Sequence, residues 1–253
     1  MADPRTRRAR SVPILPILVV GLCAVLTANM AIRDPRYVVP FLLIVALTFV
    51  PAITARRRMR ALLRSGDVKR VLGTWAGSIE RVSFPETMAP LMAATAYASY
   101  GWVESARVAL DRAVKGPAWD AALEQRLFIE TLLDTFEGQR EKAIEKAQVL
   151  ASLPMPKAGP FARKRVHLLR RGLGALARAF AHQSGNGDGE ILTRAAGASP
   201  LVHWAMRYAA AIVAVDRGEP GVVKQLLAGA PEWPTESAFR TYHDELMAHA
   251  AAG

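Results

Sequence analysis

Two uncharged apolar runs stand at the beginning of the hydropathy pattern of this chain. The first covers residues 11–32 and the second covers residues 38–55, and only the charged turn at 33–36 separates them. As helices the two runs would measure about 33 Å and about 27 Å, close to the bilayer hydrocarbon core of about 30 Å. The pattern therefore predicts a transmembrane hairpin over residues 11–55, with spans at 11–32 and 38–55.

From residue 56 to residue 253 the pattern is that of an all-α domain. Apolar residues and alanines recur at spacings of three and four, Gly and Pro interrupt them, and no stretch alternates with period two. The second apolar run is expected to continue as a helix to about residue 65. Further helices are expected at 67–81, 87–100, 102–115, 119–136, 139–152, 160–183, 189–197, 200–216, 220–229 and 235–251.

Glycines expected at the turns between helices mark an internal repeat. After each of Gly101, Gly138 and Gly218 an apolar residue follows at offsets of five and nine, and a proline follows at an offset of sixteen. These residues are Ala106, Leu110 and Pro117, then Ala143, Ala147 and Pro154, then Val223, Leu227 and Pro234. Shorter copies begin at Gly66 and Gly187. Each unit predicts a helix, a tight glycine turn and a second helix, and such pairs bury their apolar faces by stacking.

The first unit carries the signature of a known repeat in Ala94, Tyr97, Gly101, Ala106, Leu110, Ala113 and Pro117. It resembles a tetratricopeptide repeat. The second unit has Thr131 and Asp134 in place of the small residue and the aromatic, and the third has Ala211 and Ala214. The resemblance implies that residues 56–253 form an antiparallel helical-hairpin α-solenoid that binds another protein.

The net charge is concentrated beside the apolar runs. The whole chain has a net charge of +11 and a sequence pI near 10.4, a balance that by itself favours nucleic-acid binding. Residues 1–64 hold 11 Lys and Arg against 2 Asp and Glu, whereas residues 65–253 hold 22 against 20. Because Lys and Arg collect on the cytoplasmic flanks of membrane spans, the excess is explained without a nucleic acid.

The same arginines predict the topology. Four lie within residues 1–10 and five within residues 56–64, but only two lie in the turn between the runs. This distribution predicts a basic cytoplasmic segment at 1–10, a small external turn, and both termini in the cytoplasm. A cleavable signal peptide is the alternative for the first run, although no convincing small-x-small cleavage site follows it.

Residue usage indicates the compartment. Cys23 is the only cysteine, which excludes an intramolecular disulfide and a cysteine metal site. Arginine outnumbers lysine 26 to 7 and alanine is abundant, a bias typical of GC-rich bacterial genomes. Together with the apolar runs, this usage predicts a protein of the bacterial inner membrane.

The sequence contains no recognisable set of catalytic residues. Of the five histidines, His243 and His249 are the two closest in sequence, and they do not share a helix face. No carboxylate pattern completes a metal site around the histidines. The segment Ser184–Glu190 lacks the Lys-Ser/Thr of a phosphate loop and the spaced acids of a calcium loop, so a flexible interhelical loop is expected. We therefore expect no enzyme activity, no cofactor and no metal. An enzyme with a novel site is kept as an alternative.

One helix carries a basic face. Near residues 160–183, a helical wheel brings together Arg163, Lys164, His167, Arg170, Arg171 and Arg178, and apolar residues occupy the opposite side. These six residues are the candidate partner-binding or lipid-binding set. The alternatives are a solvated outer face, an acidic protein or peptide, and an anionic lipid surface. RNA is disfavoured because the aromatic residues that stack on bases are missing.

A second candidate surface is the uncharged segment Thr87–Tyr100. Most of it is expected to be core, but Tyr97, Tyr100 or Trp102 would anchor a partner if one of them faced outward.

These patterns together predict a membrane-anchored scaffold or adaptor that tethers a protein partner without chemical catalysis. The alternative is a structural or assembly subunit of an inner-membrane complex. In that case the hairpin itself would pack on partner spans through the small residues Gly21, Ala24 and Ala28.

Overall fold

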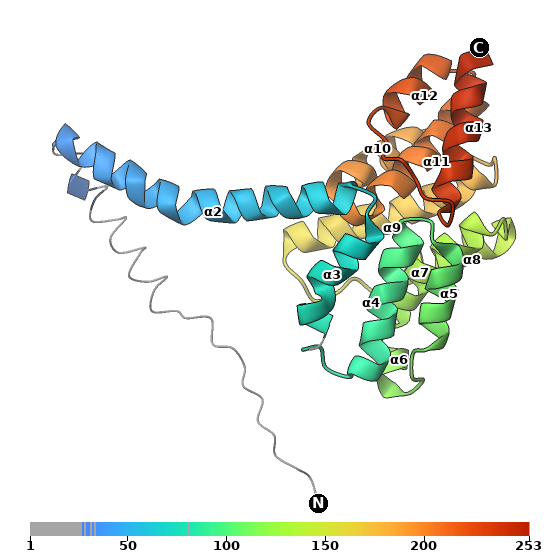
Figure 1. Cartoon of the computed structure of the whole chain (residues 1–253), viewed down its shortest axis with the longest axis horizontal. Coiled ribbons are helices and arrows are strands. Elements are labelled where there is room, and N and C mark those ends of the chain that lie inside the picture. The colour runs from blue at the N-terminus through green and yellow to red at the C-terminus, as the bar shows by residue number, and fades with distance from the viewer. Residues whose placement is uncertain (1–26, 28, 31, 33, 80, 253) are drawn as a thin grey trace, which may run out of the picture. The chain divides into compact units, whose positions relative to one another are not determined.

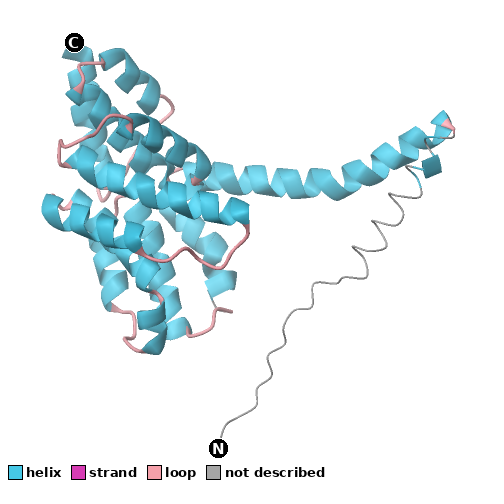
Figure 2. Cartoon of the chain, turned by 180° about the vertical axis from the view of Figure 1, so that it is seen from behind, coloured by secondary structure: helices cyan, strands magenta, loops and turns pink. Residues whose placement is uncertain are grey.

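The computed structural model describes residues 27, 29–30, 32, 34–79 and 81–252, and it divides into a first unit at 1–60 and a second unit, the helical domain, at 61–253 (Figure 1). All regular elements of the described residues are helices, as expected, and none is a strand (Figure 2). The predicted span at 11–32 and its small residues lie almost wholly outside the described residues.

The second apolar run forms a single long helix. After the short 3₁₀ helix η1 (Pro35–Tyr37), α2 (Val38–Arg64) runs for 27 residues, so it continues past residue 55 as expected. Pro51 is accommodated inside it, and the Thr54 hydroxyl donates to the Pro51 carbonyl at 2.9 Å.

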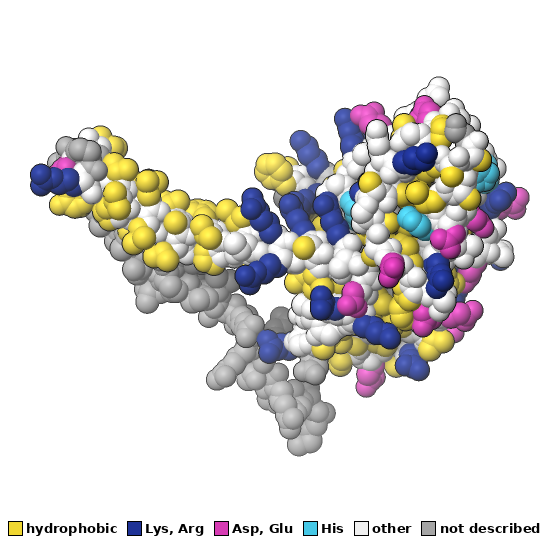
Figure 3. Space-filling model, turned by 45° about the horizontal axis from the view of Figure 1, so that its top comes forward, with side chains coloured by type: hydrophobic (Ala, Val, Ile, Leu, Met, Phe, Trp, Pro, Cys, Tyr) yellow, Lys and Arg dark blue, Asp and Glu magenta, His cyan; other side chains and the backbone are white. Residues whose placement is uncertain are grey.

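Most of the large apolar side chains in the part of α2 before residue 61 are exposed. Val39 is 71% exposed and Leu47 is 67% exposed, and Figure 3 shows apolar side chains along the visible side of this helix. By length and composition α2 is the one helix in the described part of the chain that is suited to cross a membrane.

The helical domain is a succession of helices in which chain neighbours pack against each other. The helices are α3 (Val68–Ile79), α4 (Pro85–Ser99), α5 (Val103–Asp111), α6 (Pro117–Ala121), α7 (Leu123–Phe136), α8 (Arg140–Ser152), α9 (Pro160–Phe180), α10 (Asp188–Ala198), η2 (Pro200–Val202), α11 (His203–Asp216), α12 (Pro220–Leu227) and α13 (Ala238–Ala252). This arrangement is compatible with a helical solenoid. The single helix expected at 119–136 is two helices, because the chain bends at Ala122.

The glycine turns predicted from the repeat are confirmed. Gly101, Gly138 and Gly218 have φ of +72°, +75° and +70°, and the shorter copies begin with Gly66 at +78° and Gly187 at +93°. Only glycine adopts this left-handed region without a steric penalty. The offset-five and offset-nine residues of the three full units are all buried. The second helix of each unit therefore presents its marked positions to the core.

The last turn of α2, at residues 61–64, is part of the helical domain and is held there by two buried aromatic side chains. The Tyr100 hydroxyl donates to the Leu63 carbonyl at 2.8 Å, and the Trp204 indole N–H donates to the Arg64 carbonyl at 2.8 Å. Carbonyls at a helix C-terminus lack partners within the helix, so these donors cap the end of α2. Trp204 also belongs to a continuous aromatic core with Tyr208, Trp233 and Phe239.

Candidate functional site

The basic face predicted at 160–183 lies on α9. The helix begins after Gly159 with Pro160 in its first turn, where a missing N–H costs nothing. Near this end the side chains of Arg163, Lys164 and His167 are exposed. Within the described part of the chain none of the three has an ion pair.

Arg170, by contrast, is an internal residue. Only 4% of it is exposed, and its Nε and Nη2 donate to Glu124 Oε1 on α7 at 3.1 and 2.9 Å. Its guanidinium also donates to the carbonyls of Leu153 and Pro154, at 2.6 and 3.2 Å. The helical wheel placed Arg170 with the exposed cations, but the loop before α9 folds over it. Arg170 therefore fixes this loop and is not free for a partner.

Arg178 is engaged by the first residue of α10. Its Nε and Nη2 donate to the two oxygens of Asp188 at 3.0 and 2.7 Å, and the Gly185 N–H donates to Asp188 Oδ2 at 2.8 Å. Burial of Asp188 opposes its ionisation, but the hydrogen bonds from Arg178 and Gly185 outweigh it and lower the pKa of the carboxyl. The turn expected to be a flexible loop at 184–190 is thus pinned by an ion pair.

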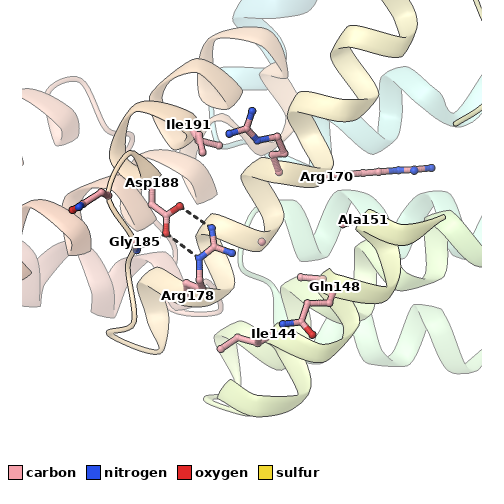
Figure 4. Close-up of a pocket in the computed structure, with 12 residues that line it drawn as sticks. Ile144, Gln148, Ala151, Arg170, Arg178, Gly185, Asp188 and Ile191 are labelled. Atoms are coloured by element: carbon pink, nitrogen blue, oxygen red, sulfur yellow. Dashed lines mark hydrogen bonds and ion pairs between the residues drawn. The ribbon is translucent and has the colours of Figure 1, made fainter. Parts of the chain in front are cut away.

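A hollow of about 500 Å³ lies between α8, α9 and α10, and we call it the α9 hollow. Its lining includes Ile144, Gln148, Arg171, Gly174, Asn186 and Ile191. In Figure 4 the ion pair of Arg178 and Asp188 lies on one side, Ile144 and Gln148 approach from α8, and Arg170 points away from the pair. Of the six predicted residues, Arg170, Arg171 and Arg178 line this hollow.

A larger groove was not predicted from the sequence. It has a volume of about 790 Å³ and is formed by α4, α6, α7, α8, α9, η2 and the segment before α4, and we call it the central groove. Most of its lining is apolar, including Met88, Phe128, Leu150, Leu169, Leu173 and Leu201. On its wall the Gln125 side-chain amide donates to the Thr95 hydroxyl at 3.0 Å. An apolar hollow with a few polar groups is the usual form of a binding site.

No protein-family model, characterised protein or solved structure matches this chain. The assignment of a function therefore rests on the geometry of the α9 hollow and the central groove.

Phe84 lines the central groove in a strained conformation. It is 68% exposed and has φ of 57° and ψ of 60°, in the left-handed region that large side chains rarely adopt. Non-glycine residues held in this region are concentrated at binding and switch sites. An exposed aromatic at the groove is an available anchor for a partner.

The uncharged segment Thr87–Tyr100 is largely core, as expected. Tyr100 is fully buried, and Tyr97 and Trp102 are half-buried and stack with ring centroids 5.9 Å apart. Met88 and Thr95, on another side of α4, line the central groove. The sequence signal for this surface is that residues 87–100 contain no charged side chain, so both the core-facing side and the groove-facing side of α4 are uncharged.

The described residues hold no group of three or more His, Cys, Asp or Glu side chains arranged to bind a metal ion. We take the α9 hollow, which three of the predicted residues line, and the central groove, which has the larger volume, as the candidate functional sites of the helical domain.

Proposed function

We propose that this protein is a membrane-anchored scaffold whose tetratricopeptide-like helical domain binds a segment of another protein. It makes and breaks no covalent bond. The proposed setting is the bacterial inner membrane, with the spans at 11–32 and 38–55 and both termini in the cytoplasm. The support for this setting is the distribution of arginines and the exposed apolar surface of α2.

The central groove is the observation that carries the proposal. Its walls come from segments between Val82 and Val202, so only the folded stack creates it. Its lining offers apolar surface with few polar groups, which favours a partner segment that inserts apolar side chains. The resemblance to tetratricopeptide repeats implies the same class of ligand, a protein segment.

Tethering would be the physical mechanism. The helical domain begins within the last turn of α2. A partner held by this domain is therefore confined near the membrane, which raises its effective concentration toward other membrane components. Such a role needs no catalytic group, only a recognition surface and an anchor.

Site-specific photo-crosslinking in intact cells tests this function. A crosslinking residue at Gln125 on the groove wall is expected to give a discrete adduct with another protein. The same residue at Val222, an exposed position on α12, is the matched control and should give none. The Gln125 adduct should also disappear when Ala121→Trp fills the groove, because Ala121 lines it.

Equal labelling from Gln125 and Val222 would show that the groove has no preferred occupant. The absence of any adduct at Gln125 would also contradict the proposed function. Persistence of the adduct in the Ala121→Trp variant would place the partner elsewhere on the domain.

A further inference from the structure

The region around α9 is strongly cationic, and most of its cations are unpaired. Residues 146–187 contain eight Lys and Arg and no Asp or Glu. Three of these cations, Lys146, Arg170 and Arg178, form ion pairs with acids from other segments. The others are exposed and have no ion pair within the described part of the chain; they are Lys157, Arg163, Lys164, Arg165 and Arg171. The region therefore presents positive charge that the helical domain does not neutralise.

The beginning of α9 protrudes from the helical domain. Every residue from Pro160 to Arg165 is exposed, and Phe161 is 83% exposed. Leu168 and Leu169 are the first residues of α9 that pack against the main core. The beginning of α9 therefore overhangs the packed helices and is not enclosed by them.

Phe161 begins a row of exposed side chains along α9, which we call the basic row. Lys164, His167 and Arg171 follow Phe161 by three, six and ten residues, and all four side chains are exposed. At about 100° per residue, the four lie within an arc of about 120° on one side of the helix. The row places an aromatic ring at the protruding end and basic side chains behind it. Helices that lie in the headgroup region of a bilayer combine the same two kinds of side chain.

The protruding end of α9 lies on the side of the helical domain at which residues 61–64, the last turn of α2, are found (Figures 1 and 2). Arg64 follows Ala55, the last residue of the apolar run, by nine residues, which measure about 14 Å as a helix. If the apolar run spans the bilayer, the chain itself confines this side of the domain near the lipid headgroups. The cytoplasmic leaflet is negatively charged and attracts basic segments close to it.

We propose that the basic row docks the helical domain on anionic lipid of the cytoplasmic leaflet, with the Phe161 ring at the level of the headgroups and the cations on lipid phosphates. Charge complementarity selects this occupant, because residues 146–187 supply cations and no carboxylate. Lys164 and Arg171 are about 10 Å apart along the helix axis, so they contact different lipids. An extended anionic surface meets this spacing, and the protruding end needs no concave partner.

This inference goes beyond the proposed function. It depends on the membrane anchor, but it does not depend on what occupies the central groove. It assigns to α9 the role of fixing the orientation of the domain on the bilayer.

The full-length chain in lipid nanodiscs, with one fluorescent reporter, tests the proposal. Cys23 is replaced by Ser, and Ala162→Cys, an exposed position next to Phe161, carries the environment-sensitive dye NBD. Blue-shifted emission is expected in phosphatidylcholine with about 30% phosphatidylglycerol but not in phosphatidylcholine alone, because the anionic lipid attracts the row. The same dye at Val222→Cys on α12 is the matched control and should emit alike in both lipids. A signal at Ala162→Cys that does not differ between the lipids would overturn the proposal.

A pair of charge variants tests whether the row itself docks. Lys164→Gln combined with Arg171→Gln is expected to lower the docking equilibrium constant about tenfold or more, because two basic contacts with the anionic surface are lost. Arg112→Gln combined with Lys115→Gln removes the same charge from exposed positions at and after the end of α5. This control pair should change the constant less than about twofold, because charges far from the surface are screened. Equal losses in the two pairs would show that only net charge matters and would overturn the proposal.

Phe161→Ser separates insertion of the ring from diffuse attraction. This variant keeps every cation and is expected to lower the docking equilibrium constant about fivefold or more, because the ring no longer leaves water. If Phe161→Ser docks like the wild type, no ring enters the headgroup region and the row is not the docking element described above.

Photo-crosslinking in intact cells distinguishes lipid from protein. A crosslinking residue at Ala162 is expected to label lipid and to give no discrete adduct with a protein. A discrete protein adduct there would overturn the proposal and assign the basic row to an acidic protein. The Gln125 adduct tests the scaffold function separately, so either result at Ala162 leaves the test of the central groove unchanged.

Discussion

Asp134→Ala is expected to lower the free energy of unfolding of the helical domain by about 2 kcal/mol. Asp134 lies on α7 and is 3% exposed. It forms ion pairs with two cations from neighbouring helices. Arg107 Nη2 on α5 lies 3.0 Å from its Oδ1, and Lys146 Nζ on α8 lies 2.7 Å from its Oδ2. Removal of the carboxylate leaves Arg107 with Glu137 at 2.6 Å and Lys146 with Glu130 at 3.0 Å. The expected loss is therefore that of the charge-assisted contacts that Asp134 makes between the three packed helices, and no cation is left without a carboxylate.

The matched control is Glu190→Ala on α10. Glu190 pairs with Arg194 at 3.0 Å, but both side chains are about two-thirds exposed. An exposed pair contributes at most about 1 kcal/mol, so this variant should unfold at nearly the same urea concentration as the wild type. Urea titration of the full-length chain in detergent, followed by helical circular dichroism, gives both values. Equal stabilities of the two variants would show that Asp134 does not join the three helices.

Gly101→Ala is expected to destabilise the domain by about 3 kcal/mol, through two separate effects. The φ of +72° costs an L-residue about 1–2 kcal/mol. The new methyl group would lie 3.1 Å from Ser237 Oγ and 3.2 Å from a ring carbon of Phe239. Ser237 cannot move freely because its hydroxyl donates to the Tyr100 carbonyl at 2.7 Å.

Gly138→Ala isolates the backbone effect. Gly138 has φ of +75° at the equivalent turn of the next unit, and a Cβ there meets nothing within 4 Å. In this variant the free energy of unfolding should fall by about 1–2 kcal/mol, clearly less than in Gly101→Ala. The same urea titration measures the difference. A loss at Gly138 as large as that at Gly101 would mean that α13 does not pack against the Gly101 turn.

The sequence predicted these turns because the requirement for glycine is local. A left-handed residue between two helices selects glycine whatever lies around it, so the spacing of Gly66, Gly101, Gly138, Gly187 and Gly218 was visible without the fold. The buried positions at fixed offsets follow from the helical period. Helix type and most helix boundaries were predictable for the same reason.

Contacts between distant segments were not predictable. Arg170 lies on the polar side of a helical wheel, but Glu124 and the carbonyls before α9 enclose it. Asp134 stands where the repeat resemblance implies an aromatic residue, and its partners come from two other helices. The central groove likewise exists only where separate segments converge. A sequence pattern reports which side of a helix is polar but not which neighbour covers it.

The central claim is that an apolar helix holds the helical domain at a membrane, and alkaline carbonate extraction of membranes from cells producing the full-length chain tests it most directly. The protein is expected to stay in the membrane pellet and to be released only by detergent, because the exposed apolar surface of α2 lies in the bilayer. Recovery of the protein in the carbonate supernatant would contradict this claim.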